Sequence, residues 1–317
     1  DLQSLRDARQ QQLKARLKSS ADLDDFSSLF APARRDTFEQ MANTDLAQRE
    51  IAAIYRCDLS LMISEYEIDL LVEHFNVPRA LLHWCPLMVD SVPATFVPFE
   101  QRQHFLSIGN FRHAPNWDAV LWMKTTVWPL IRQQLPGAQL HVYGAYTPPK
   151  ATALHNPAQG FHVLNWAEDA LEVMSHARIC MAPLRFGAGI KGKIADAMLC
   201  GTPNVTTPVG AEGMHGDLPW AGAIEQSATA IATAAVHLYQ NAEAWHQAQQ
   251  HGQTLLAQRY LQASHGPALV ECIERCRTGL EQHRRNNFTG AMLRHHQHKS
   301  TQYMAQWIEA KNRPHTL

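Results

Sequence analysis

A short glycine- and lysine-rich stretch contains the residues whose types most clearly suggest chemistry. Residues 183–203 read PLRFGAGIKGKIADAMLCGTP, with Gly187, Gly189, Lys191, Gly192 and Lys193 standing before an apolar helical pattern. A loop that leads into a helix exposes backbone N–H groups without partners, and the helix dipole adds about half a positive charge there. Glycine lets the backbone approach a ligand, and lysine supplies charge. The stretch therefore predicts an anion-binding loop.

The spacing of these residues narrows the choice of anion. It matches neither the G-x-x-x-x-G-K-[ST] loop of ATP-binding proteins nor a clean G-x-G-x-x-G dinucleotide pattern. One turn further on, Asp196 faces the same side of the expected helix as Gly192 and Lys193. A carboxylate there can accept both hydroxyls of a ribose, or it can merely complement the helix dipole. For the loop as a whole, the expected ligand is a nucleoside diphosphate.

Short β-rich runs alternate with helical patterns along the middle of the chain. Such alternation is typical of βαβ units, in which helices cover both faces of a parallel sheet. Because parallel strands bring their following loops to one edge, the glycine loop is expected at the ligand-binding edge of the sheet. The expected strands are 104–109, 138–144, 161–164, 178–184, 203–207 and 222–225, and the expected helices lie near 116–134, 168–176, 190–200 and 227–240.

The composition argues against several other classes of protein. The 317 residues include 28 Lys and Arg against 29 Asp and Glu, so no overall charge favours nucleic acid. Six cysteines without a C-x-x-C pair indicate a reducing compartment, and we expect the cytoplasm. Cys272 and Cys276 share a helix face, but without further ligands no metal site is expected there. No apolar run approaches the roughly 20 residues of a membrane span.

The two ends of the chain differ from its middle. Residues 1–19 predict a charged helix whose basic face is either solvated or in contact with lipid headgroups. Residues 49–78 predict helix, strand and helix, which is too little for a stable sheet, so part of an N-terminal domain is expected to be missing. Residues 282–317 are basic and include a His-rich tract at 295–298. This extension is expected to dock on an acidic or phosphate-bearing surface, with metal binding as the alternative.

Several segments resemble one enzyme family, in the same order along the chain. APLRFGAGIKGKIADAMLCGTPNVTTPVGAEGM resembles the donor-binding signature of bacterial group 1, or family 4, glycosyltransferases of the GT-B fold. FLSIGNFRHAPNWDAVLWMKTTVWPLI and LNWAEDALEVMSHARICMAPLR are similar to other parts of the family's donor domain. CDLSLMISEYEIDLLVEHFNVP is similar to the last βα unit of its acceptor domain. The resemblance covers about residues 46–280 and implies a sugar nucleotide held between two Rossmann-like domains.

This resemblance implies a division of the chain into three parts. Residues 1–100 would be a partial, acceptor-side domain with a Rossmann-like α/β fold. Residues 101–281 would be the complete Rossmann-like domain that binds the nucleotide sugar. Residues 282–317 would form a basic helical extension that crosses back toward the first domain.

The resemblance also implies roles for individual residues. The positions that match the family's donor site are Asn110, Arg112, Trp166, Arg185, Gly187, Gly189, Ile190, Lys191 and Asp196. The glycine loop would wrap the diphosphate, and Asp196 stands where the family has a ribose-binding glutamate. Asn110 and Arg112 would face the phosphates, and Trp166 would lie near the base. Arg185 is either a phosphate ligand or a structural cation.

The sequence departs from the family pattern in two places. Ala188 stands where the family often has a glutamate that points at the sugar. The usual Arg and Lys pair of the first loop is represented only by Arg112, with Asn116 near the expected lysine. The catalytic residue is unknown, because the family's acceptor-side residues fall in sequence that this chain lacks.

The implied function is a metal-independent glycosyltransferase of the hexosyltransferase type, acting in bacterial glycan biosynthesis. It would transfer a sugar from a UDP-, GDP- or similar nucleotide sugar, with retention and without a cofactor, to a glycan, lipid-linked or protein acceptor. Its location would be cytoplasmic, with a peripheral contact at the inner membrane face left open, and no nucleic-acid partner is expected. We expect a chain that lacks part of the acceptor domain to transfer sugar poorly on its own. The alternatives are another GT-B enzyme, such as a sugar-nucleotide epimerase, and a non-catalytic nucleotide-sugar-binding or scaffold module.

Overall fold

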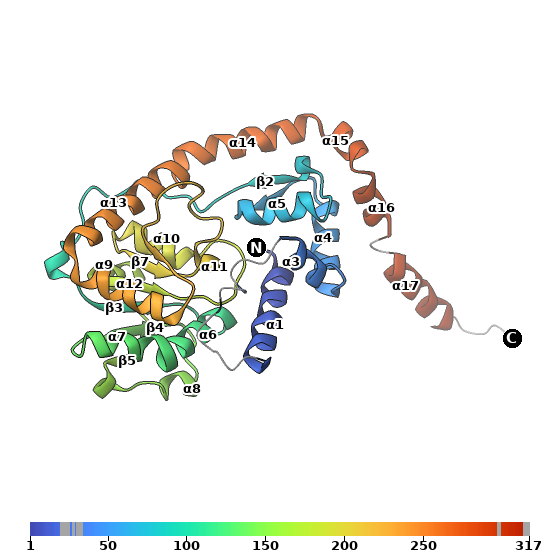
Figure 1. Ribbon diagram of the computed structural model, residues 1–317. Helices are drawn as coiled ribbons and strands as arrows, with labels where there is room; N and C mark the ends of the chain where they lie inside the picture. The colour runs from blue at the N-terminus through green and yellow to red at the C-terminus, as the bar shows by residue number, and fades with distance from the viewer. Residues whose placement is uncertain (20–25, 27–28, 30–33, 297–298, 313–317) are drawn as a thin grey trace.

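A six-stranded parallel sheet forms the centre of the molecule (Figure 1). The computed structural model describes residues 1–19, 26, 29, 34–296 and 299–312. The strand order is β5-β4-β3-β6-β7-β8, and every neighbouring pair is parallel. All six strands expected from the sequence are present, so the α/β prediction is confirmed. They are β3 (Gln103–Ile108), β4 (Leu140–Tyr143), β5 (Phe161–Asn165), β6 (Ala177–Ala182), β7 (Asn204–Thr206) and β8 (Gly222–Ile224).

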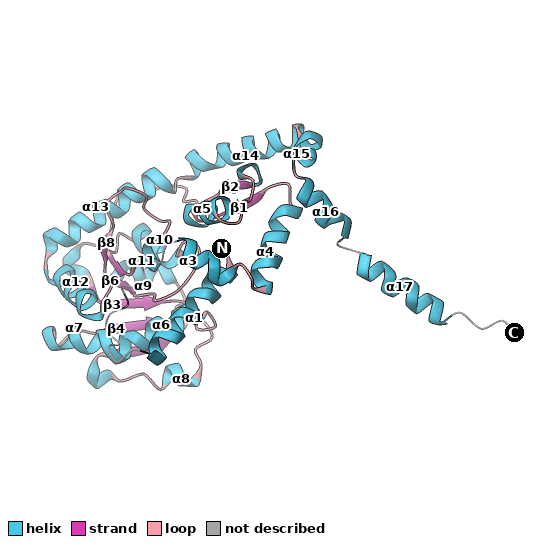
Figure 2. Cartoon of the chain, turned by 45° about the vertical axis from the view of Figure 1, so that its right-hand side comes forward, coloured by secondary structure: helices cyan, strands magenta, loops and turns pink. Residues whose placement is uncertain are grey.

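Helices cover both faces of this sheet (Figure 2). On one face α12 packs against α7, and on the other α9 and α10 pack together, with α13 against α10. A π-helical turn at Met123–Val127 interrupts the long helix expected at 116–134, because Pro129 has no N–H to bond the carbonyl one turn earlier. The helices are α6 (Ala114–Trp122), α7 (Trp128–Gln134), α8 (Pro149–Thr152), α9 (Ala170–His176), α10 (Gly192–Leu199), α11 (Pro208–Ala211), α12 (Ala228–Gln240) and α13 (Ala242–Arg259).

A smaller unit precedes the central sheet. Its two strands are parallel, and the sequence predicted only the first. Its buried core includes Leu5, Met41, Leu71 and Leu82. The domain boundary near residue 100 stays a prediction. The elements are α1 (Gln3–Ser19), α3 (Arg34–Met41), α4 (Asp45–Arg56), β1 (Ser60–Met62), α5 (Glu65–Glu73) and β2 (Leu82–Trp84).

Helix α1 joins the two units instead of lying on the surface. Leu5 and Ala8 pack in the core of the smaller unit, whereas Leu13 packs in the core of the larger one. Lys14 and Lys18 are exposed, as the expected solvated face requires. Arg9, however, is only 4% exposed. The apolar side of the helix is therefore an interface between the units.

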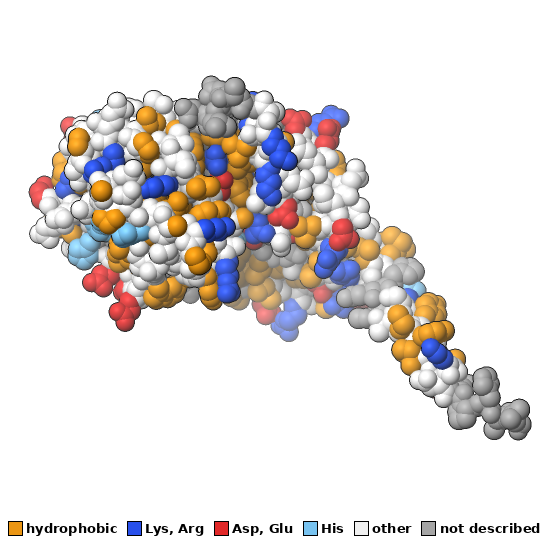
Figure 3. All heavy atoms as spheres, turned by 90° about the horizontal axis from the view of Figure 1, so that it is seen from below, with side chains coloured by type: hydrophobic (Ala, Val, Ile, Leu, Met, Phe, Trp, Pro, Cys, Tyr) orange, Lys and Arg blue, Asp and Glu red, His pale blue; other side chains and the backbone are white. Residues whose placement is uncertain are grey.

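The C-terminal helices return across the molecule and then leave it (Figure 1). They are α14 (Gln262–Thr278), α15 (Leu280–Asn286), α16 (Phe288–His296) and α17 (Lys299–Asn312). Helix α16 packs on α4 of the smaller unit. Helix α17 projects from the body with Tyr303, Met304, Trp307 and Ile308 exposed, and apolar side chains are visible along this arm in Figure 3.

The described residues bear on the expectations about membrane spans and metal sites. Within it, no helix has both the length and the apolar composition of a membrane span. The same residues contain no group of three His, Cys, Asp or Glu side chains arranged to hold a metal ion. His298 of the His-rich tract and the basic Arg313 lie outside the described residues.

A buried arginine fastens the chain that enters β3 to the face of the sheet that carries α9 and α10. The Arg102 guanidinium donates to the carbonyls of Val97, Ala177 and Cys200 and to the Thr202 hydroxyl, at 2.6–3.2 Å. It also stacks over Trp245, 5.0 Å from the ring centroid. None of these partners is an acid, and burial lowers the pKa of Arg102 to about 10. Its role is to satisfy several carbonyls at once.

Replacing this residue should therefore destabilise the larger unit. We expect Arg102→Met to lower the free energy of unfolding by about 3 kcal/mol, because buried carbonyls lose their donors. Urea unfolding followed by circular dichroism measures the change. Arg285→Met is the control, since that side chain is 70% exposed. Equal stability of the two variants would show that Arg102 does not hold this region together.

Candidate donor site

The sheet has one point at which its strand order reverses. From β3 the chain adds β4 and β5 on one side, and then returns to add β6, β7 and β8 on the other. Loops that follow the two central strands diverge there, which leaves a crevice at the carboxyl edge of the sheet. The loop 109–113 follows β3, and the glycine loop follows β6. The two loops singled out in the sequence therefore meet at the place where open parallel sheets bind ligands.

Lys193 bridges these two loops. Its ammonium donates to the Asn116 side-chain carbonyl at 2.6 Å, and the Asn116 amide donates to the backbone carbonyl of Asn110 at 2.9 Å. A Cβ added at Gly109 would lie 2.8 Å from the Lys193 ammonium, so a larger residue there would displace this side chain. Lys193 thus brings a positive charge to the first loop, where the family pattern has a lysine and this chain has Asn116.

Arg185 crosses the same crevice but is already paired. Its guanidinium donates two hydrogen bonds to the Asp118 carboxylate, at 2.9 and 2.6 Å, and only 8% of its side chain is exposed. It also lies over the Trp122 ring. Of the two roles expected for Arg185, the geometry supports the structural cation.

The glycine loop is covered by the smaller unit. Gly189 has the positive φ that the sequence predicts, at 62°, whereas Gly187 is not among the positive-φ glycines. The Gly189 N–H donates to the Glu67 carboxylate at 2.8 Å, and Arg9 donates to the Gly187 carbonyl at 2.9 Å. The expected anion contact at Gly189 is therefore made by a carboxylate of the chain itself.

Lys191 faces into the loop. Its ammonium donates to the carbonyls of Ala188 and Gly189, and only 8% of the residue is exposed. Ile190 packs with the apolar cluster beside α10. Burial lowers the pKa of Lys191 to about 8, and burial lowers that of Lys193 to the same value. Both lysines therefore lose their positive charge at a pH only slightly above neutral.

The N-terminus of α10 remains open to an anion. Lys191 is the N-cap residue, and among the described residues no side chain caps this helix. His113, the N-cap of α6, makes no capping bond with its side chain either. The start of α6 offers few donors, however, because Pro115 has no N–H and the Asn116 N–H donates to the His113 carbonyl at 3.0 Å. The start of α10 is therefore the helix N-terminus beside Lys193 that can receive an anion.

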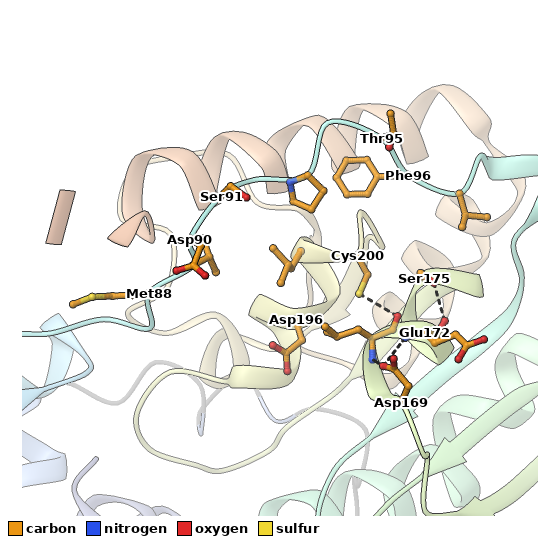
Figure 4. Close-up of a pocket in the computed structure, with 15 residues that line it drawn as sticks. Met88, Asp90, Ser91, Thr95, Phe96, Asp169, Glu172, Ser175, Asp196 and Cys200 are labelled. Atoms are coloured by element: carbon orange, nitrogen blue, oxygen red, sulfur yellow. Dashed lines mark hydrogen bonds between the residues drawn. The ribbon is translucent and has the colours of Figure 1, made fainter. Parts of the chain in front are cut away.

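Asp196 lines a cavity of about 980 Å³ (Figure 4). The linker at 88–97 forms one wall, and α9 and α10 form the other. Asp196 has no hydrogen-bond or ion-pair partner in the described part of the chain, and burial raises its pKa. The cavity also contains Asp90, Asp169 and Glu172 but no lysine or arginine. It therefore suits hydroxyl groups better than phosphate.

The remaining predicted residues lie at the rim. Asn110 accepts the backbone N–H of Arg112 at 2.8 Å, and the Arg112 guanidinium stacks on the Tyr146 ring at 3.6 Å. Trp166 is 70% exposed after β5. The structure brings Asn110 close to Lys193 through Asn116, but it does not place Arg112 or Trp166 in contact with the glycine loop within the described residues.

Three residues near the site were missed from the sequence. Glu67, Arg9 and Arg6 come from the smaller unit, more than a hundred residues before the loops that they touch. The only local signal is the SEYE segment, which places acidic residues in the first turn of an expected helix.

Comparisons with known proteins concern the central sheet and the fold. Residues 102–241 match the family model of the glycosyl transferases group 1, which corresponds to the segment from β3 to the end of α12. No curated protein matches the sequence. Several solved structures share the fold at low sequence identity, and the chain spans about half the length of the first of them.

Three of these structures illustrate the range. TarM of S. aureus, in complex with UDP, fondaparinux and α-GlcNAc-glycerol, has a TM-score of 0.60 and 12% identity, over 72% of this chain and 46% of its own. Sucrose-phosphate synthase of Thermosynechococcus elongatus has a TM-score of 0.58 and 15% identity, over 75% and 63%. HepE of Anabaena, in complex with UDP and glucose, has a TM-score of 0.54 and 12% identity, over 72% and 66%.

These structures are GT-B glycosyltransferases, and the chain has their α/β fold. The family model lies on the sheet that carries the crevice, the glycine loop and Asp196. The match over residues 102–241 therefore makes this part of the chain similar to the glycosyl transferases group 1.

Proposed function

We propose that this protein transfers a sugar from a nucleoside diphosphate sugar, and that the central sheet binds the donor. The observation that carries the proposal is the pairing of an available cation and an available carboxylate on α10. Lys193 and Asp196 are three residues apart, so their Cβ atoms are roughly 5–6 Å apart on one helix face. This separation suits the phosphates and the ribose of one nucleotide.

The phosphates of the donor would rest on the open N-terminus of α10. Lys193 supplies a positive charge there, and the loop after β3 supplies Asn110 and Asn116. The Gly189 N–H is held by Glu67, so we assign the main phosphate contacts to Lys193 and the helix N-terminus instead. Lys191 stabilises the loop from inside.

The ribose would bind at Asp196. This carboxylate has no other partner and opens onto the acid-lined cavity, so it can accept both ribose hydroxyls. A phosphate would be repelled from the same cavity by its four carboxylates. The distribution of charge along α10 therefore orients the nucleotide, with phosphates at the helix start and the nucleoside beyond it.

The leaving diphosphate would be stabilised by protein groups alone. Cations and helix N-termini aimed at the developing negative charge provide this stabilisation without a metal ion. We further propose retention at the anomeric carbon, on the basis of the family resemblance. The acceptor class, the cytoplasmic location and a peripheral membrane contact stay predictions from the sequence.

Product analysis with labelled sugar nucleotides tests the function. Transfer to an acceptor or to water supports a glycosyltransferase, and isomerisation supports the epimerase alternative. Tight binding without turnover supports the non-catalytic module. Failure to bind any sugar nucleotide would contradict the proposal.

Loss of the Lys193 charge should selectively weaken binding of nucleoside diphosphates. We expect Lys193→Gln to reduce affinity for UDP or GDP by about ten- to a hundredfold, because a charge-assisted hydrogen bond is lost. Affinity for uridine or guanosine should change little. Calorimetry compares the four ligands, with Lys124→Gln as control, since Lys124 contacts Gln159 away from the site. An equal loss for nucleoside and diphosphate would refute this assignment.

Asp196→Asn should reduce the affinity for ribose-containing ligands and leave the fold intact. The amide keeps the shape of the side chain but loses the charged acceptor for two hydroxyls, which costs about tenfold in affinity. The comparison is between UDP and its 2′,3′-dideoxy analogue in both proteins. If the unmodified protein binds the two ligands equally, Asp196 does not read the ribose.

Diphosphate binding should weaken as the pH rises above neutral. The pKa of Lys193 is about 8 in the free protein, so this lysine is mostly charged at pH 7 and mostly neutral at pH 9. A bound diphosphate favours the charged form, so affinity should fall about tenfold between these pH values. The readout is the ratio of UDP to uridine affinity. The Lys193→Gln protein should show a shallower fall, and an identical fall in both would contradict the role of Lys193.

A further inference from the structure

A cation of the smaller unit reaches the same crevice. Arg6, on α1, approaches the His113 ring with its Nη1 atom 3.2 Å from Nε2. A guanidinium has donors only, so Nε2 is the acceptor and the imidazole is neutral with its proton on Nδ1. His113 is the N-cap of α6 and follows the loop after β3. The contact therefore joins the smaller unit to the edge where phosphates are expected.

The charges at this place are not balanced by acids. The charges of Arg6, Lys193 and Lys191 all contribute to a lowered pKa of His113, after burial as the largest cause, so the four groups lie within electrostatic reach. Lys193 is bonded to a neutral amide. Besides His113, Arg6 contacts the carboxylate of its neighbour Asp7, through Nε at 3.6 Å, and its Nη2 has no partner among the described residues.

The neighbouring charged groups are already committed to one another. Arg9 donates two hydrogen bonds to the Glu212 carboxylate, at 2.8 and 2.7 Å. Asp118 is paired with Arg185, and Glu67 accepts two backbone N–H groups. The surplus of positive charge therefore belongs to Arg6 and Lys193, which stand beside the start of α10, where the N-cap side chain makes no capping bond. An anion with more than one charged oxygen would satisfy all of them.

We propose that Arg6 is a phosphate-binding residue, which holds the donor diphosphate from the side of the smaller unit while Lys193 holds it from the larger one. His113 positions the guanidinium, and the planar fork leaves Nη2 free for a phosphate oxygen. The inference rests on the proposed function. It adds that both units bind the nucleotide, so the diphosphate links α1 to the central sheet.

The test compares two charge-removing variants on the same helix. Arg6→Gln should reduce the affinity for UDP and GDP by about tenfold or more. The affinity for uridine and guanosine should stay unchanged, since only the diphosphate contacts the guanidinium. Arg6→Lys should give an intermediate loss, because the charge stays and the fork is lost. Lys14→Gln, at an exposed position on α1, should change UDP affinity less than about twofold. Thermal unfolding of each variant verifies that α1 remains packed.

The outcomes separate this inference from the proposed function. If UDP binds the unmodified and Arg6→Gln proteins equally, Arg6 is not a phosphate ligand, and the donor site on the central sheet still stands. If Lys14→Gln reduces UDP affinity as much as Arg6→Gln does, the loss reflects only the total positive charge of α1, and the inference is wrong. If neither diphosphates nor nucleosides bind the unmodified protein, the proposed function fails and this inference fails with it.

Discussion

The buried carboxylate of Glu67 is the interaction on which the arrangement of the site depends. It accepts the N–H of Leu2 at 3.1 Å and the N–H of Gly189 at 2.8 Å, and it is fully buried. Both N–H groups donate to Oε1, whereas the buried Oε2 accepts no hydrogen bond within the described residues. One side chain of α5 thus fixes both the start of α1 and the turn of the glycine loop. Without it, the positive φ at Gly189 and the inward turn of Lys191 would lose their support.

This constraint moves the expected anion site along the chain. Because the glycine loop is held by Glu67 and Arg9, the positive groups left for a ligand lie one turn later, at Lys193 and the open start of α10. Helix α1 is packed into both apolar cores, so its Arg6 is held at the same crevice. The acid-lined cavity at Asp196 lies one helical turn after Lys193 along α10. Charge therefore divides α10 into a cationic start and an acid-lined end.

The sequence predicted the parts of this structure that depend on local patterns. The six strands of the central sheet follow from alternating β-rich and helical segments, and the position of the glycine loop follows from parallel topology. Strand β2 was missed because its pairing with β1 is a tertiary contact that no local pattern indicates. The partners of the loop were missed because they are tertiary: Arg9 and Gly187 are 178 residues apart, and Glu67 and Gly189 are 122 apart. The role of Lys193 opposite Asn116 likewise depends on two loops meeting in space.

The central claim is that a nucleoside diphosphate binds where the loops after β3 and β6 meet. Hydrogen exchange measured by mass spectrometry, with and without UDP or GDP, tests it most directly, because open N–H groups at a helix start exchange freely until an anion covers them. The account predicts slower exchange in peptides that cover residues 109–116 and 187–196, with no change in α17. Unchanged exchange at both loops, under conditions in which calorimetry shows that the diphosphate is bound, would place the ligand elsewhere and contradict the account.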